Sequence, residues 1–228
     1  MSGLTIGNGS GGTPGSSSNY KLDGGTHTFN ITKKNITFSG SRFYDATTTV
    51  SSNDLVTTAT ATGETLGFTG SGTVSSKNVQ NGQVITVGTI AITDGSGGGL
   101  ADNYNLTTGT FDINQKWVTV SGQRAYDATN SVSSSDLSVT GEISGENISI
   151  TGTGSITDKN VGSGKSINTS GLTLADGTHS ASNYTIGTTN FAVTRRNLTI
   201  SGEKVYDGNG TVSSSQIDTI NTVGGETL

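Results

Sequence analysis

Apolar residues in this chain recur in short runs that alternate with polar residues. This period of two is typical of a β-strand with one buried face. Turn-forming residues separate the runs, and Asp94-Gly95 and Asp176-Gly177 predict hairpin turns. The clearest alternating pairs are Ile36 and Phe38, Val118 and Val120, and Leu198 and Ile200. No helical period is present, so the pattern predicts an all-β protein.

Three blocks of sequence recur in the same order along the chain. Residues 35–52 (NITFSGSRFYDATTTVSS) match blocks that start at residues 117 and 197, offsets of 82 and 80 residues. Residues 63–79 match 145–161, and residues 225–228 begin another copy. Residues 103–113 match residues 183–193. They also match residues 19–31, which carry a two-residue insertion. Short helical turns are expected at Ser51–Leu55, Ser133–Leu137 and Ser213–Ile217.

The register of these blocks divides the chain into repeats of about 80 residues. Residues 1–34 form the back part of one repeat, 35–116 and 117–196 are complete, and 197–228 begin a fourth. We therefore expect a piece of a longer array, in which neighbouring repeats stabilise one another. Seven or eight short strands fit each repeat. The predicted architecture is tandem, elongated β-sandwich-like units forming a rod, and the alternative is a continuous β-solenoid.

Most aromatic residues recur in register, which predicts that they anchor the repeat cores, since each buries a large area. A carbohydrate-stacking platform is the alternative. The expected anchors are Tyr20, Tyr104 and Tyr184 at one position, Tyr44, Tyr126 and Tyr206 at a second, and Phe29, Phe111 and Phe191 at a third.

The apolar positions change parity where one repeat meets the next. Phe111 and Ile113 are odd-numbered, whereas Val118 and Val120 are even-numbered. Because strand side chains alternate faces, we expect one core to end and another to begin there. No Gly/Ser linker intervenes, so the joint should be stiff.

Composition narrows the class of protein. The 228 residues carry a net charge of −5, only 13% are charged, 29% are hydrophobic, 35 are Gly and none is Cys. An acidic chain lacks the basic footprint for nucleic acid and for anionic membranes. No apolar run is long enough to insert in a membrane, and no signal peptide precedes the repeats. A cysteine-free chain of this composition fits a bacterial exoprotein.

No constellation of residues predicts an enzyme. The two histidines, His27 and His179, occupy non-equivalent repeat positions, and zinc, EF-hand and phosphate-loop motifs are absent. We therefore expect no catalytic, cofactor-binding or metal residues. The alternative is calcium held by scattered carboxylates, for example around Asp94, Asp102 or Asp158.

The block Lys204-Val205-Tyr206-Asp207-Gly208, with its copies at Tyr44-Asp45-Ala46 and Tyr126-Asp127-Ala128, resembles the YDG/MBG repeats of filamentous-haemagglutinin-like bacterial adhesins. Asp45, Asp127 and Asp207 are expected to cap turns. The resemblance implies large secreted or surface adhesins exported by two-partner secretion, with no activity in the repeat.

We therefore expect an extracellular stalk on the bacterial surface that supports cell adhesion or a biofilm matrix. Its partners would be neighbouring repeats, and glycans or other adhesin molecules. A glycan- or protein-binding repeat module, with or without calcium, is the alternative function.

Overall fold

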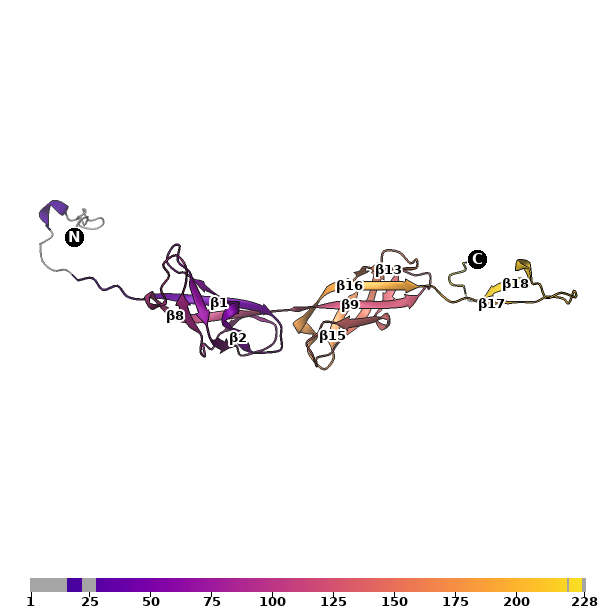
Figure 1. The fold of residues 1–228 in the computed structure, drawn as a ribbon, viewed down its shortest axis with the longest axis horizontal. Coiled ribbons are helices and arrows are strands. Elements are labelled where there is room, and N and C mark those ends of the chain that lie inside the picture. Colours follow the sequence, from indigo (N-terminus) through magenta and orange to yellow (C-terminus); the bar gives the residue numbers. More distant parts are fainter. Residues whose placement is uncertain (1–15, 22–27, 221, 227–228) are drawn as a thin grey trace. The chain divides into compact units, whose positions relative to one another are not determined.

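The computed structural model describes residues 16–21, 28–220 and 222–226, and the chain divides into two units, residues 1–33 and 34–228 (Figure 1). In the described part of the first unit, Ser17–Asn19 form a short 3-10 helix, η1. All the described strands lie in the second unit.

Residues 34–114 build one set of sheets around a central strand, β1. A four-stranded sheet has the order β3-β1-β8-β6, in which β1 is antiparallel to β3 and parallel to β8. Two further antiparallel pairs join β2 with β5 and β4 with β7. The strands are β1 (Lys34–Phe43), β2 (Thr49–Ser51), β3 (Leu55–Thr58), β4 (Leu66–Thr69), β5 (Ser71–Thr73), β6 (Gln80–Val84), β7 (Ala91–Asp94) and β8 (Tyr104–Asn114).

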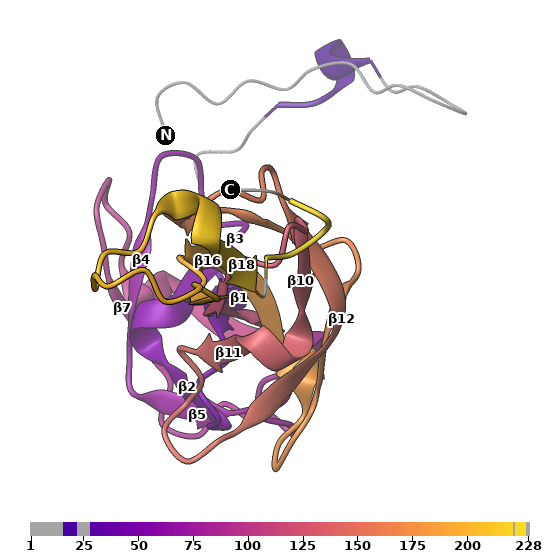
Figure 2. The same cartoon turned by 90° about the vertical axis from the view of Figure 1, so that its right-hand side faces the viewer.

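Residues 116–194 repeat this plan. The sheet order β11-β9-β16-β13 again places the first strand parallel to the last, β16. One long strand, β12, pairs with β10, β14 and β15, and β10 lies beside β12 in Figure 2. The strands are β9 (Lys116–Ala125), β10 (Ser131–Ser133), β11 (Leu137–Thr140), β12 (Ile148–Ile156), β13 (Gly162–Lys165), β14 (Ile167–Asn168), β15 (Leu172–Asp176) and β16 (Tyr184–Thr194).

The predicted all-β class is confirmed. Among the described residues, every sheet takes its strands from one repeat, whereas a solenoid would continue its sheets from one repeat into the next. A third copy of the plan begins with β17 (Thr199–Gly202), which is antiparallel to β18 (Ile217–Ile220) as β1 is to β3.

The parity change at the repeat boundary is present in the structure. Phe111 and Ile113 at the end of β8 are fully buried, and so are Val118 and Val120 near the start of β9. The expectation of separate cores was wrong in one respect, because the first core continues across the boundary. Phe38, Phe111 and Ile113 form one cluster with Val118, Ile148, Ala181 and Tyr184 of the next repeat. A second cluster around Val120 and Phe191 fills the rest of that repeat.

The predicted helical turns are confirmed as 3-10 helices. They are η2 (Ser52–Asp54), η4 (Ser134–Asp136) and η6 (Ser214–Gln216). Ser51 and Ser133 cap the first two, because each side chain accepts a hydrogen bond from the backbone N–H two residues later.

The predicted hairpins at Asp94-Gly95 and Asp176-Gly177 were wrong. Neither β7 nor β15 pairs with the strand that follows it. The Asp94 carboxylate instead accepts a hydrogen bond from Ala101 N at 2.8 Å, and that of Asp176 from Ala181 N at 2.7 Å. These bonds order a loop that ends in a 3-10 helix, η3 (Ala101–Asn103) or η5 (Ala181–Asn183). Asp therefore acts here as a loop cap and not as part of a hairpin turn.

Candidate functional site

The joint between the two complete repeats contains several polar contacts that link the repeats. Only Gln115 separates β8 from β9. Its side-chain N–H group donates to the carbonyl oxygens of Ser182 and Tyr184, both at 3.1 Å. The connecting residue is therefore tied to the second repeat, and the joint has no slack segment.

Glu146 lies at the centre of the joint. Its carboxylate accepts a hydrogen bond from the Tyr44 hydroxyl of the first repeat at 2.7 Å and from the Tyr184 hydroxyl of its own repeat at 2.6 Å. The two rings meet edge to face with centroids 5.5 Å apart. Glu146 is only 4% exposed, the Lys77 ammonium lies 3.8 Å away as a positive partner, and the His179 ring nitrogen Nε2 lies 3.9 Å away. A buried charge is tolerated only with such partners.

The electrostatics of the joint favour an ionised Glu146 between neutral tyrosines. Burial raises the pKa of Glu146, but hydrogen bonds from Tyr184 and Tyr44, together with the charges of His179 and Lys77, hold it below its ordinary value. Burial and the hydrogen bond to Glu146 raise the pKa of Tyr184 to about 12, and raise that of Tyr44 further. The hydroxyls therefore remain donors over the physiological range of pH.

A buried amide forms a second contact across the joint. Asn183 is 1% exposed. Its side-chain oxygen accepts from Val79 N at 2.9 Å, and its NH₂ group donates to the Asn78 side-chain oxygen at 3.0 Å. Asn183 belongs to the second repeat, and Asn78 and Val79 belong to the first. Both of its hydrogen-bonding groups therefore serve to hold the neighbour.

The same contact begins again at the next boundary. The Tyr126 hydroxyl donates to the carboxylate of Glu226, which also pairs with Lys159 at 3.2 Å. Within the first repeat, the Tyr104 hydroxyl donates to Glu64 as that of Tyr184 does to Glu146. Equivalent glutamates at 64, 146 and 226 thus accept from recurring tyrosines.

A Tyr-Asp step recurs in the three repeats, and its first copy, Tyr44-Asp45, includes the tyrosine of this joint. Asp45, Asp127 and Asp207 each accept from the backbone N–H two residues later, at 3.0, 3.0 and 3.1 Å. Each also pairs with the basic residue three positions earlier, at 3.1, 2.9 and 2.8 Å. The structure therefore places all three predicted aspartates at turns. Ala46, Ala128 and Gly208 follow them with φ of 64°, 65° and 84°, the left-handed region that favours Gly.

Five of the expected aromatic anchors lie in the cores. Tyr44, Tyr104, Tyr184, Phe111 and Phe191 are at most 4% exposed. The guanidinium groups of Arg42 and Arg124 lie over the last two rings, at 5.3 and 5.6 Å from the centroids. Tyr126 is half-buried against the second core cluster.

The expectation was wrong for Tyr20, Phe29 and Tyr206, which are 67%, 79% and 91% exposed. Among the described residues, no parallel strand pairs with their segments as one does with the equivalent segments. Tyr206 follows β17, which has no parallel partner among the described residues, and residues 28–33 form no strand. The motif alone does not bury the ring, because the covering strand comes from about 70 residues away in the chain, as the Lys34–Tyr104 register shows.

Sequence reasoning overlooked the glutamates and Asn183. The recurrence of Gly-Glu at residues 63–64, 145–146 and 225–226 was visible, as was Asn immediately before Tyr at 103–104 and 183–184. The Gly-Glu and Asn-Tyr pairs both stand at the start of blocks that define the repeat, so their recurrence indicates the repeat itself and not a contact. A glutamate is rarely buried, so its recurrence was not recognised as a core feature.

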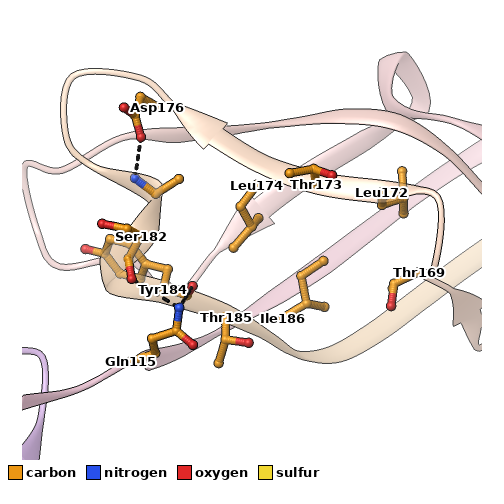
Figure 3. Close-up of a pocket in the computed structure, with 11 residues that line it drawn as sticks. Gln115, Thr169, Leu172, Thr173, Leu174, Asp176, Ser182, Tyr184, Thr185 and Ile186 are labelled. Atoms are coloured by element: carbon orange, nitrogen blue, oxygen red, sulfur yellow. Dashed lines mark hydrogen bonds between the residues drawn. The ribbon is translucent and has the colours of Figure 1, made fainter. Parts of the chain in front are cut away.

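No chemistry beyond this network is apparent in the described ranges. The described residues contain no group of three or more His, Cys, Asp or Glu side chains that could hold a metal, and no helix long and apolar enough to cross a membrane. Asp158, one of the suggested calcium ligands, pairs with Lys165 at 2.7 Å. The hollow in Figure 3 has Gln115 and Asp176 among its polar members, and both are already bonded to backbone groups.

Comparison with known families gives one result. A family model described as the YDG domain matches residues 28–111 and again residues 113–191. Comparison with curated proteins and with solved structures gave no match. Each matched segment contains the first strand of one repeat and most of the last strand that lies parallel to it.

Proposed function

Because this chain belongs to the YDG domain family, we propose that its repeats form the stalk of a large extracellular bacterial adhesin, supporting cell adhesion or a biofilm matrix. The repeats then serve to hold neighbours in a fixed relation and carry no catalysis. The observation that carries the proposal is Glu146, a buried acid shared by tyrosines of two successive repeats.

This arrangement suits a spacer because it makes each repeat depend on the next. Tyr44 is 2% exposed, and Tyr184 of the following repeat packs edge to face against it. Tyr126, at the equivalent position of the next repeat, is only half-buried, and among the described residues no second tyrosine packs against it. A one-residue connection and a shared core cluster add to this coupling. Filamentous-haemagglutinin-like exoproteins exported by two-partner secretion, which the repeats resemble, would use such an array to hold a distal binding region.

Spin labels test the stiffness that this proposal requires. The chain has no Cys, so Asn53→Cys and Ser135→Cys place labels at equivalent exposed positions of the two repeats. Electron–electron distance measurement should give one narrow peak, as narrow as that of a control pair within one repeat, Asn53→Cys with Asn81→Cys. A broad distribution for the first pair alone would show a flexible joint and refute the stalk.

Protease treatment of intact cells tests whether the protein lies outside the cell. Trypsin added to intact cells of the source organism should release peptides of this region, which mass spectrometry identifies, while a cytoplasmic marker stays intact. Peptides found only after lysis would contradict the extracellular assignment.

A glycan-binding role is the second candidate, favoured by one exposed aromatic pair. Trp117 is 67% exposed and Phe43 is 55% exposed, with ring centroids 5.5 Å apart. Beside Trp117 lies a hollow whose rim carries the Thr119 and Thr188 hydroxyls, 2.7 Å apart. Aromatic faces with a few hydroxyls suit a neutral sugar ring.

The single Trp makes this role easy to test by fluorescence titration with neutral hexoses and N-acetylhexosamines. Trp117→Asn is a matched control, because Asn occupies this position at residues 35 and 197. Saturable quenching or a blue shift of the Trp117 emission would support the role, provided that a separate affinity assay shows binding by the unchanged chain and none by Trp117→Asn. No response to any sugar would refute the role.

A further inference from the structure

Two Asn-Gly steps lie in the part of the chain that the structure describes. They are Asn81-Gly82 in β6 and Asn209-Gly210 in the turn that follows the third Tyr-Asp step. All four residues are exposed. Such a step is chemically labile, because Gly has no side chain to hinder attack of its backbone nitrogen on the Asn carboxamide. The two steps have the same sequence, so a difference in their reactivity comes from the surrounding structure.

The turn that holds Asn209 has the same construction in the complete repeats. The Lys204 ammonium donates to the main-chain oxygen and to the side-chain oxygen of Asn209, at 3.0 and 2.8 Å. In the second repeat Arg124 donates in the same way to both oxygens of Thr129, which is also exposed. The first repeat shows the same pattern. The geometry and the exposure of Asn209 therefore belong to the turn itself.

The contacts of the turn make the Asn209 carboxamide a better electrophile. Its side-chain oxygen accepts from the Lys204 ammonium at 2.8 Å and from Thr211 N at 2.9 Å. The Lys204 side chain is only 16% exposed and also pairs with Asp207 at 2.8 Å, so the ammonium is fixed in place. Two donors on one carbonyl oxygen, one of them charged, stabilise the negative charge that develops when a nucleophile attacks the carbon.

The attacking backbone nitrogen is free at one step and hydrogen-bonded at the other. The Gly210 N–H group donates to none of the described residues, and the space around this glycine is open. The Gly82 N–H group instead donates to the Asp112 carboxylate at 2.7 Å. The Asn81 side-chain oxygen accepts from no described group. The structure therefore favours reaction at Asn209 and opposes it at Asn81.

We propose that Asn209 is a site of spontaneous deamidation assisted by Lys204. The Gly210 nitrogen bonds to Cγ of Asn209 and gives its proton to solvent, while Lys204 and Thr211 stabilise the negative side-chain oxygen. The bond from Cγ to the carboxamide nitrogen then breaks, and the NH₂ group takes a proton from solvent and leaves as ammonia. The product is a five-membered succinimide. Water opens this ring at either carbonyl, so that residue 209 ends as aspartate or isoaspartate.

The reaction changes the charge and the backbone of this turn. A carboxylate replaces a neutral amide beside Lys204 and Asp207, and the isoaspartate form adds a methylene to the backbone path. Thr47 and Thr129 stand at the equivalent positions and have no carboxamide. The third Tyr-Asp turn therefore acquires a negative charge with time, whereas the turns of the two complete repeats do not.

Incubation of the whole purified chain in heavy-oxygen water tests the proposal, because each new deamidation incorporates a heavy oxygen and earlier damage does not. Peptide mapping by mass spectrometry gives the rates at Asn81 and Asn209, in the folded chain and in guanidinium chloride. The two rates should be alike in the unfolded chain. In the folded chain Asn209 should react at least about tenfold faster, since Gly82 must first lose a hydrogen bond to a charged group. Equal rates in the folded chain would overturn the proposal.

Substitutions at Lys204 separate assistance by the ammonium from simple exposure of the asparagine. Arg stands at this position in both complete repeats, so Lys204→Arg should preserve the rate at Asn209. Lys204→Met should lower the rate by at least about tenfold, because one donor to the developing negative charge is lost. An unchanged or faster rate in Lys204→Met would show that the ammonium only restrains the turn, and the proposal would fail.

Transfer of the step to a complete repeat tests whether the turn alone creates the reactivity. The double variant Thr129→Asn with Asn130→Gly places an Asn-Gly step in the second turn, where Arg124 supplies the charged donor. This new step should deamidate about as fast as Asn209. A rate as low as that of Asn81 would contradict the proposal, because the reactivity would then not come from the turn.

Discussion

Replacing Tyr44 by Phe removes one hydroxyl and leaves the ring in place. The hydroxyl donates to Glu146, which is ionised and 4% exposed, so solvent does little to screen the bond. A hydrogen bond to a charged group contributes about 1.5–3 kcal/mol. We therefore expect Tyr44→Phe to lower the free energy of unfolding by about 1.5–3 kcal/mol.

Urea denaturation followed by Trp117 fluorescence and by circular dichroism measures this loss. Trp117 is the one Trp of the chain, and its ring contacts Phe43 of the preceding repeat, so its emission reports on the joint. A double-mutant cycle with Glu146→Gln should give a coupling energy of about 1 kcal/mol or more. Tyr104→Phe is the matched control, because Tyr104 donates to Glu64 within a single repeat.

The two tyrosine variants should differ in cooperativity. Tyr44→Phe weakens the contact between repeats, so the fluorescence and circular dichroism transitions should separate, whereas Tyr104→Phe should shift both together. A loss below about 0.5 kcal/mol for Tyr44→Phe, or strict additivity with Glu146→Gln, would refute the role of this bond.

The remaining predictions concern the turn, pH and calcium. Ala128 has a φ of 65°, which costs a non-Gly residue about 1 kcal/mol, so Ala128→Gly should not destabilise the chain and should raise the melting temperature slightly; a loss above about 1 kcal/mol would contradict this. Because the folded-state pKa of Glu146 is lowered, its stabilising contribution is present above the ordinary value of 4.5 and is lost as pH falls below it, and Glu146→Gln should flatten the acid limb of stability against pH. Because the pKa of Tyr184 is raised from 10.0 to about 12, its contribution is lost as pH rises through that interval, and Tyr184→Phe should reduce the alkaline loss. Millimolar calcium or a chelator should leave the melting temperature unchanged, since no group of three acidic or His side chains gathers in the described ranges; a rise of several degrees with calcium would contradict this.

Local features of the fold could be predicted from the sequence. Alternation located the strands around Ile36 and Val118, and the Asp side chain predicted the turn at Asp45, because both depend on residues a few positions apart. The hairpins were mispredicted from the same kind of signal, since an Asp-Gly step also suits a loop capped by the Asp94 carboxylate.

Contacts between repeats could not be predicted in the same way. Tyr44 and Tyr206 share a motif, yet one is 2% and the other 91% exposed. The difference depends on a covering residue such as Tyr184, far away in the chain. Glu146 was missed for a related reason: its burial is stabilised by four groups from separate segments, and no local pattern indicates that they meet.

The parallel pairing of first and last strands determines how a repeat responds to tension along the chain. Force enters a repeat at the start of β1 and leaves at the end of β8, at opposite ends of two adjacent parallel strands. Pulling therefore shears the ladder lengthwise and loads its hydrogen bonds together, where a hairpin would open one pair at a time. In both repeats the pairing runs nearly the full length of the two strands, from Lys34–Tyr104 to Phe43–Asn114 and from Lys116–Tyr184 to Ala125–Thr194. Each repeat thus carries a mechanical clamp on the direct line between its neighbours.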